Sequence, residues 1–223
     1  SNYRAGVNAG NSIASGGNYN VTVGDEAGTA ITTGDENVAV GYNALSTNTT
    51  GSGNVAIGKD ALLNNLTGVN NVAVGDSAGE NTTGSNNTAI GDKALIINTL
   101  GSHSVAIGKA ALTQQNYTTA TTAYNVAIGS SAGVNVSTGT LNTLIGSLAG
   151  DELTTGQQNV ALGYQALSGD DVGNHSVAIG TGALLSQNFA TATNSYNTAV
   201  GSTAGSALTT GIRNTLIGGL AGD

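Results

Sequence analysis

Residues 37–45 read Asn-Val-Ala-Val-Gly-Tyr-Asn-Ala-Leu, and residues 54–62 read Asn-Val-Ala-Ile-Gly-Lys-Asp-Ala-Leu. Variants of this phrase recur along the chain at spacings of 16, 17 or 21 residues. A fixed period of this length is typical of a solenoid, in which a repeat is stable only when it is stacked on its neighbours. The glycine that ends the phrase, called the motif glycine below, occurs at Gly24, Gly41, Gly58, Gly75, Gly91, Gly108, Gly129, Gly146, Gly163, Gly180, Gly201 and Gly218.

The three residues before each motif glycine alternate in size. Val or Thr comes first, a residue that is mostly Ala follows, and Val, Ile or Leu comes last. Alternation with a period of two predicts a short strand with β-branched residues on one face and a small residue on the other. We expect the β-branched residues to form the core in ladders about 4.8 Å apart. With a weaker copy of the phrase at residues 2–6, the expected fold is all-β, a parallel β-solenoid of about 13 coils of roughly 17 residues.

The residues outside this strand also recur at fixed positions. An alanine three residues after every motif glycine, as at Ala44 and Ala61, predicts the start of a second strand. Asn four residues before most motif glycines predicts a ladder of side-chain hydrogen bonds from coil to coil. Glycine seven residues before, as at Gly51 and Gly156, predicts a turn with positive φ.

Two coils are longer than the rest, and residues 105–150 realign with 177–222 at an offset of 72. The extra residues fall in 115–124 and 187–196, which we expect to protrude as loops. Exposed aromatic side chains on such loops are candidate contacts with a partner, although they could instead pack down onto the coils. The four candidates are Tyr117, Tyr124, Phe189 and Tyr196.

Composition excludes several classes of protein. The chain has 35 glycines, no proline, no cysteine, 5 basic and 13 acidic residues, and a formal net charge of −8. So few cations argue against nucleic acid as a partner, because such binding depends on neutralising phosphates. No apolar run is long enough to insert into a membrane. We interpret residues 1–223 as a single solenoid domain within a longer fibre, with residues 1–17 as an irregular or capping coil because Arg4 and Ala5 interrupt the apolar pattern.

No set of residues in the sequence indicates catalysis. His103 and His175 occupy the same register four coils apart, which is too far for one shared site. The acidic pairs, such as Asp151-Glu152 and Asp170-Asp171, lack the repeated calcium-binding phrase. We therefore expect no catalytic residue, metal or cofactor, and no enzyme. Ice binding is a distant alternative: flat threonine arrays can order water, but adjacent threonines such as Thr32-Thr33 and Thr154-Thr155 point in opposite directions.

The alanine face predicts an oligomer. Small residues let flat strands approach closely, and a three-fold axis suits three parallel copies of a fibre. The expected structure is therefore a parallel homotrimer. Its candidate seam is Ala39, Ala56, Ala73, Ala106, Ala127, Leu144, Ala161, Ala178 and Leu216.

Two copies of the phrase, Ser104-Val105-Ala106-Ile107-Gly108 and residues 176–180, resemble the head repeats of trimeric autotransporter adhesins, the YadA-like family. The resemblance covers nearly the whole chain from about residue 18. It implies a left-handed β-roll, a homotrimer, an extracellular or cell-surface location, and attachment to host cells, matrix or other surfaces. Family repeats are typically shorter, and neither a stalk nor a membrane anchor is present in this sequence. The alternative function is the shaft of a phage or virus tail fibre, or a purely structural filament.

Overall fold

The computed structural model describes residues 1–13 and 16–223, and within them all regular structure is β-strand. The chain forms two compact units, residues 1–104 with 116–121, and residues 105–115 with 122–223. The three-residue strands number six in the first unit and seven in the second, which confirms an all-β parallel solenoid of about 13 turns. Whether the two units make one domain stays a prediction.

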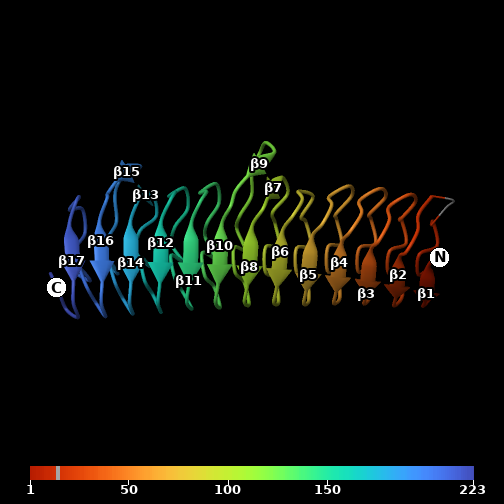
Figure 1. The fold of residues 1–223 in the computed structure, drawn as a ribbon, viewed down its shortest axis with the longest axis horizontal. Coiled ribbons are helices and arrows are strands. Elements are labelled where there is room, and N and C mark those ends of the chain that lie inside the picture. Colours follow the sequence, from red (N-terminus) through yellow and green to blue (C-terminus); the bar gives the residue numbers. More distant parts are fainter. Residues whose placement is uncertain (14–15) are drawn as a thin grey trace. The chain divides into compact units, whose positions relative to one another are not determined.

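The first unit stacks its six strands in parallel, and Figure 1 draws them side by side. Neighbours pair with equivalent residues opposite each other, as in Val38 with Val55 and Ala39 with Ala56. The first coil, expected to be irregular, has a strand that pairs in this same register, although its residues 14–15 lie outside the described residues. The strands are β1 (Tyr3–Ala5), β2 (Val21–Val23), β3 (Val38–Val40), β4 (Val55–Ile57), β5 (Val72–Val74) and β6 (Thr88–Ile90), with a further short strand β7 (Gly101–Ser102).

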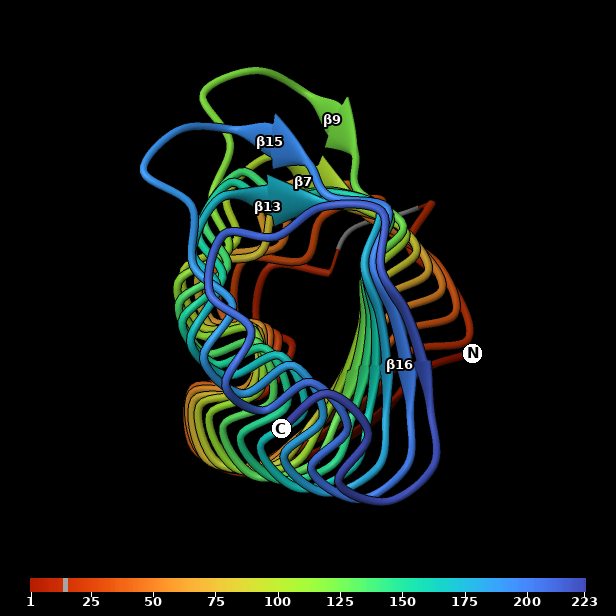
Figure 2. The same cartoon turned by 90° about the vertical axis from the view of Figure 1, so that its left-hand side faces the viewer.

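The second unit repeats the arrangement with seven stacked strands. It also has a two-stranded parallel pair, in which β13 (Gly173–Asn174) pairs with β15 (Thr193–Asn194) of the long coil that follows residue 180. In Figure 2 this pair lies on the side of the coil next to the side formed by the strand β16. The stacked strands are β8 (Val105–Ile107), β10 (Val126–Ile128), β11 (Thr143–Ile145), β12 (Val160–Leu162), β14 (Val177–Ile179), β16 (Thr198–Val200) and β17 (Thr215–Ile217), and β9 (Thr121–Thr122) lies in the first long loop.

The middle residue of each strand faces the interior of the coil, which reverses the expected orientation. Ala39 is fully buried, whereas Val38 and Val40 are partly exposed on the outer face. The interior is filled from the other wall by leucines such as Leu45, also fully buried. A coil of this size has room opposite such a leucine for little more than a methyl group, so alanine stands inside.

The predicted alanine seam is therefore wrong. Eight of its nine candidates are fully buried within their own chain and cannot line an axis between copies. The ninth, Leu216, points the same way and is partly exposed only because it belongs to the last coil. The eight are Ala39, Ala56, Ala73, Ala106, Ala127, Leu144, Ala161 and Ala178.

Leu144 fills the interior of its coil. It replaces the usual alanine and lies against Gly133 and Gly150, at a position that leucine and glycine occupy equally often along the chain, as in Leu45 and Gly79. A Cβ added to Gly133 would lie 2.6 Å from Leu144 Cδ1, and one added to Gly150 would lie 2.8 Å from its Cδ2. The large residue thus fills space inside the coil that the neighbouring glycines leave, as close packing requires.

The segment after the motif glycine is a series of tight bends, so the expected second strand is wrong. Asn43 and Leu45 have φ of 56° and 53°, while the alanine between them is not in the left-handed region. Ala44 N donates to Gly41 O at 3.3 Å within the bend, and Leu45 N donates to Ala61 O at 2.9 Å in the next coil. The bend therefore keeps hydrogen bonds between coils without extended geometry.

The recurring glycines serve two different purposes. Gly41, a motif glycine, has φ of 130°, which side chains rarely adopt. Gly156, seven residues before a motif glycine, is outside the positive-φ set, so that expectation is wrong. A Cβ at Gly156 would instead lie 2.5 Å from Gly173 O in the next coil. Close stacking of backbones, rather than a positive φ, demands glycine there.

The asparagine ladder is confirmed. Asn54 N donates to Asn37 Oδ1 at 3.0 Å, and Asn54 Nδ2 donates to Gly68 O at 2.9 Å. Asn71 N in turn donates to Asn54 Oδ1 at 3.0 Å. Each ladder residue thus satisfies buried backbone groups of the adjacent coils, which would otherwise lack partners.

Candidate interaction surfaces

The outer face of the stacked strands is apolar in both units. We call it the apolar sheet face, and it consists of the first and third residues of the three-residue strands from β2 onward. Within it, Ile57, Ile128 and Leu162 are 40%, 36% and 42% exposed. Its members are Val21, Val23, Val38, Val40, Val55, Ile57, Val72, Val74, Thr88 and Ile90 in the first unit, and Val105, Ile107, Val126, Ile128, Thr143, Ile145, Val160, Leu162, Val177, Ile179, Thr198, Val200, Thr215 and Ile217 in the second.

Columns of β-branched residues suit a pleated strand whichever way they face. Contiguous exposed apolar columns are nevertheless unusual on a soluble monomer, and large patches of this kind mark interaction sites. Tyr42 and Tyr164, which follow motif glycines at the edge of this face, are 53% and 50% exposed and add aromatic area to it. The apolar sheet face is therefore the leading candidate for a protein interface.

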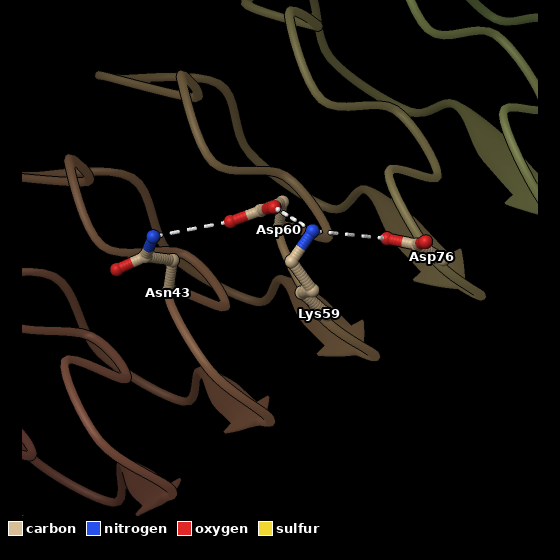
Figure 3. Close-up of polar contacts among 4 residues, drawn as sticks. All are labelled: Asn43, Lys59, Asp60 and Asp76. Atoms are coloured by element: carbon tan, nitrogen blue, oxygen red, sulfur yellow. Dashed lines mark hydrogen bonds and ion pairs between the residues drawn. The ribbon is translucent and has the colours of Figure 1, made fainter.

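A small charged group borders this face in the first unit (Figure 3). Lys59 Nζ lies 3.0 Å from Asp60 Oδ2 and 3.9 Å from Asp76 Oδ1, and Asn43 Nδ2 donates to Asp60 Oδ1 at 3.1 Å. The hydrogen bond that Lys59 donates to Asp60, and then the negative charge of Asp60, raise the pKa of Lys59. The lysine side chain is 60% exposed, so water screens these contacts and they add little to stability. This charged group therefore forms a solvent-exposed edge of the apolar sheet face.

The long loops hold two of the four predicted contact residues inside. Tyr117 and Phe189 are only 6% and 5% exposed, so both pack down onto the coils and cannot serve as surface contacts. Tyr124 and Tyr196 are 55% and 50% exposed, and their contact with a partner stays a prediction. The inward-facing aromatics fill the space under loops that would otherwise enclose a void.

A buried polar cluster anchors the second long loop. Gln187 Nε2 donates to Asp170 Oδ2 at 2.6 Å and to Ser176 Oγ at 2.8 Å, and Asn197 Nδ2 donates to Gln187 Oε1 at 2.8 Å. Gly173 N donates to Asp170 Oδ1 at 3.0 Å. Burial raises the pKa of the Asp170 carboxyl, and the bonds from Gln187 and Gly173 offset part of that rise.

Sequence reasoning missed this cluster, although a signal was present. Asp170 and Gln187 both stand seven residues after a motif glycine, where Asn48 and Asn65 stand in other coils, and all four are fully buried. The Asn-to-Gln change coincides with the long coils, since Gln115 and Gln187 both occur there. A glutamine in place of a buried asparagine indicates that its hydrogen-bond partner lies farther away, because the insertion has shifted that partner.

Four side chains lie together at the base of the loop, of which Asn194 and Tyr196 are exposed and Asn174 and His175 are half-buried. The rings of His175 and Tyr196 stack with centroids 5.0 Å apart and planes inclined by 13°. Asn174 Nδ2 donates to Asn194 Oδ1 at 3.2 Å beside them. We call these residues the ring–amide platform.

Residues 1–13 and 16–223 contain no enclosed pocket and no group of three or more His, Cys, Asp or Glu placed to hold a metal. Nor do they contain a helix long and apolar enough to cross a membrane. His103 and His175 belong to different compact units and are not brought together within either.

Fold and surfaces together define a β-solenoid repeat protein. Comparison of the chain with protein-family models, with curated proteins and with solved structures gave no match. The function must therefore be argued from the surfaces of this chain.

Proposed function

We propose that the chain is a segment of a homotrimeric extracellular fibre, of the adhesin-head kind, with a structural and adhesive role rather than a catalytic one. The apolar sheet face is the observation on which the proposal depends. In this proposal the coil is the left-handed β-roll that the sequence resemblance implies, and the fibre attaches to cells, matrix or other surfaces.

The repetition of the apolar sheet face favours a second copy of this chain as its occupant. Every stacked strand presents the same two outward positions, and successive strands pair without a shift in register. A partner must therefore offer complementary apolar groups at the same spacing over many coils. An identical chain in parallel register meets that requirement, and closed rotational symmetry limits the assembly to a defined number of copies.

This proposal moves the seam from alanine to the β-branched residues. Burying the exposed parts of Ile57, Ile128 and Leu162 between copies removes apolar area from water, which favours association by about 25 cal/mol for each Å². The charged group around Lys59 then lies at the rim, where ion pairs select orientation more than they add affinity.

Ice binding gains no support from the threonine columns. Thr32 Oγ1 donates to Thr49 O at 2.9 Å, and Thr154 Oγ1 donates to Asp171 O at 3.0 Å, both in the next coil. These hydroxyls brace the stack instead of forming a free array toward water. The virion-fibre shaft remains the alternative, since it would use the same apolar sheet face.

The experiment measures the mass of the assembly. The parent chain is expected to be a trimer by mass photometry and by light scattering coupled to chromatography. Ile57→Lys with Leu162→Lys places charges on the apolar sheet face of each unit and should give monomers. The matched control is Thr50→Lys with Thr155→Lys, which places the same charges at exposed positions elsewhere on the coils and should leave the trimer intact. A folded parent monomer at micromolar concentration would refute the proposal.

A further inference from the structure

Part of the ring–amide platform makes no packing contact within the chain. Tyr196 leaves half of its surface open to solvent although one side is stacked on His175. A tyrosine buries its ring when packing is its main role, as Tyr117 does in the other long loop. The half of the Tyr196 side chain that stays open to solvent is therefore available to a ligand.

The two amides beside the rings are held in fixed positions. Parallel pairing places Asn174 opposite Asn194, and Gln157 N donates to Asn174 Oδ1 at 2.8 Å. With Asn174 Nδ2 bound to Asn194 Oδ1, the NH2 group of Asn194 donates to no group among the described residues. It faces solvent as a ready donor, next to carbonyl oxygens that still have acceptor capacity.

Hydrogen bonds of Ser195 hold the backbone of the ring–amide platform in place. Its N and Oγ both donate to Asn174 O, at 3.0 and 3.1 Å, and its Oγ lies 2.7 Å from Ser176 Oγ in the buried cluster. The rings and amides thus sit on backbone that is tied at several points. A site arranged before binding loses little conformational freedom when a ligand arrives.

We propose that the ring–amide platform binds a pyranose ring of a surface polysaccharide, an inference that rests on the proposed function because it takes the fibre to be extracellular. The C–H groups on one face of a sugar ring pack against the electron-rich face of an aromatic ring. Sugar hydroxyls both donate and accept, which matches the two properties of an amide group. No enclosed pocket surrounds the platform, so one ring binds weakly, and a polysaccharide gains strength by reaching the platforms of several copies at once.

Arg213 is placed where it could distinguish acidic sugars from neutral ones. It follows Tyr196 in the same column of exposed residues, and its backbone N donates to Ser195 O at 2.7 Å. The platform itself has no acidic side chain. A neutral sugar needs only the rings and amides, whereas an acidic sugar also pairs its carboxylate with the Arg213 guanidinium. Both kinds of sugar pack a ring against Tyr196 in the same way. The variant Arg213→Gln distinguishes them, because it should weaken binding of the acidic sugar only.

The test is saturation-transfer NMR on the full chain with hexasaccharides of glucose, mannose and N-acetylglucosamine, and with hexagalacturonate. Ligands are used at about 10 mM, above the millimolar Kd expected of a single weak site. Tyr196→Ala should weaken binding about 3- to 10-fold, the effect of one lost aromatic contact. Asn174→Ser with Asn194→Thr, which restores the residues found 72 positions earlier, should weaken it to a similar extent.

The matched control is Tyr19→Ala. Tyr19 stands at the same register position in the first unit and is 68% exposed, but its neighbours in the column are Ser1 and Glu36, whereas those of Tyr196 are His175 and Arg213. Its substitution should leave binding unchanged. Binding that Tyr196→Ala does not alter, or no transfer from any of the four probes, would overturn the platform.

Mass photometry on the same samples separates this inference from the proposed function. A trimer that binds no sugar overturns the platform alone. A monomer that binds sugar through Tyr196 overturns the trimeric fibre and supports the platform.

Discussion

Asn54 offers the sharpest test of how the coils are held together. The side chain is fully buried and links three coils. Its Nδ2 donates to Gly68 O at 2.9 Å and to Asn37 Oδ1 at 3.1 Å, and its Oδ1 accepts from Asn71 N at 3.0 Å and from Asn65 Nδ2 at 3.3 Å. Asn54→Ala removes these four bonds, two of which satisfy backbone groups, and puts no other polar group in their place.

The magnitude follows from the two backbone groups left behind. A buried donor or acceptor that loses its partner costs about 1–3 kcal/mol. Asn65 Nδ2, at 3.4 Å from Gly68 O, recovers part of the acceptor's loss, whereas Asn71 N has no substitute. We therefore expect Asn54→Ala to lower the free energy of unfolding by about 3 kcal/mol.

The assay is guanidinium denaturation followed by circular dichroism, at one fixed protomer concentration because association would shift the midpoint. The control is Asn64→Ala, which removes an exposed asparagine that donates to Asn81 Oδ1 at 2.7 Å. Solvent replaces that bond, so the loss should stay below about 1 kcal/mol. Equal losses for the two variants would refute the view that the ladder stabilises the stack by satisfying buried backbone groups.

Two other changes have outcomes set by the structure. Gly41→Ala should destabilise the chain by about 3 kcal/mol or more in the same assay, because φ is 130° and the new Cβ would lie 2.6 Å from Gly58 O. Gly182→Ala, at φ of 63° with only a methyl group at 3.5 Å, should cost about 1 kcal/mol, and a cost as large as that of Gly41→Ala would contradict this explanation. Asp170 has a pKa raised by burial, so its contribution to stability is present below the ordinary pKa of 3.8 and is lost as pH rises through the folded value. Asp170→Asn removes the titrating group, so its free energy of unfolding should lack the fall that the parent shows as pH rises through the folded pKa of Asp170, and parallel pH profiles of the two proteins would rule this out.

Much of the fold was predictable because stacking imposes one period on the whole chain. The phrase around Gly41 gave the coil length, the position of each strand and the parallel register, since equivalent residues must lie above one another in a solenoid. The ladder through Asn54 was predictable for the same reason. Leu45 was not expected at φ of 53°, because a leucine has no local preference for that region and only bonds to neighbouring coils hold it there.

The ring–amide platform was harder to predict from the sequence. Tyr124, Tyr196 and the two buried aromatics looked alike as loop residues, and only the path of each loop decides which of them packs down. Asn174 and Asn194 are 20 residues apart, and they meet because a two-residue strand pair closes the base of the insertion. No local pattern announces a strand of that length.

The sequence by itself determined that this protein is a stack of short coils and that Val38 and Ala39 face opposite ways. It could not determine which of the two faces inward, because a period of two is unchanged when the strand is turned over. The tertiary structure decided it: Leu45 enters the coil from the opposite wall and leaves space for a methyl group only. Val38 and its equivalents are therefore turned outward, and the surface that we propose for assembly is the one expected to be the core.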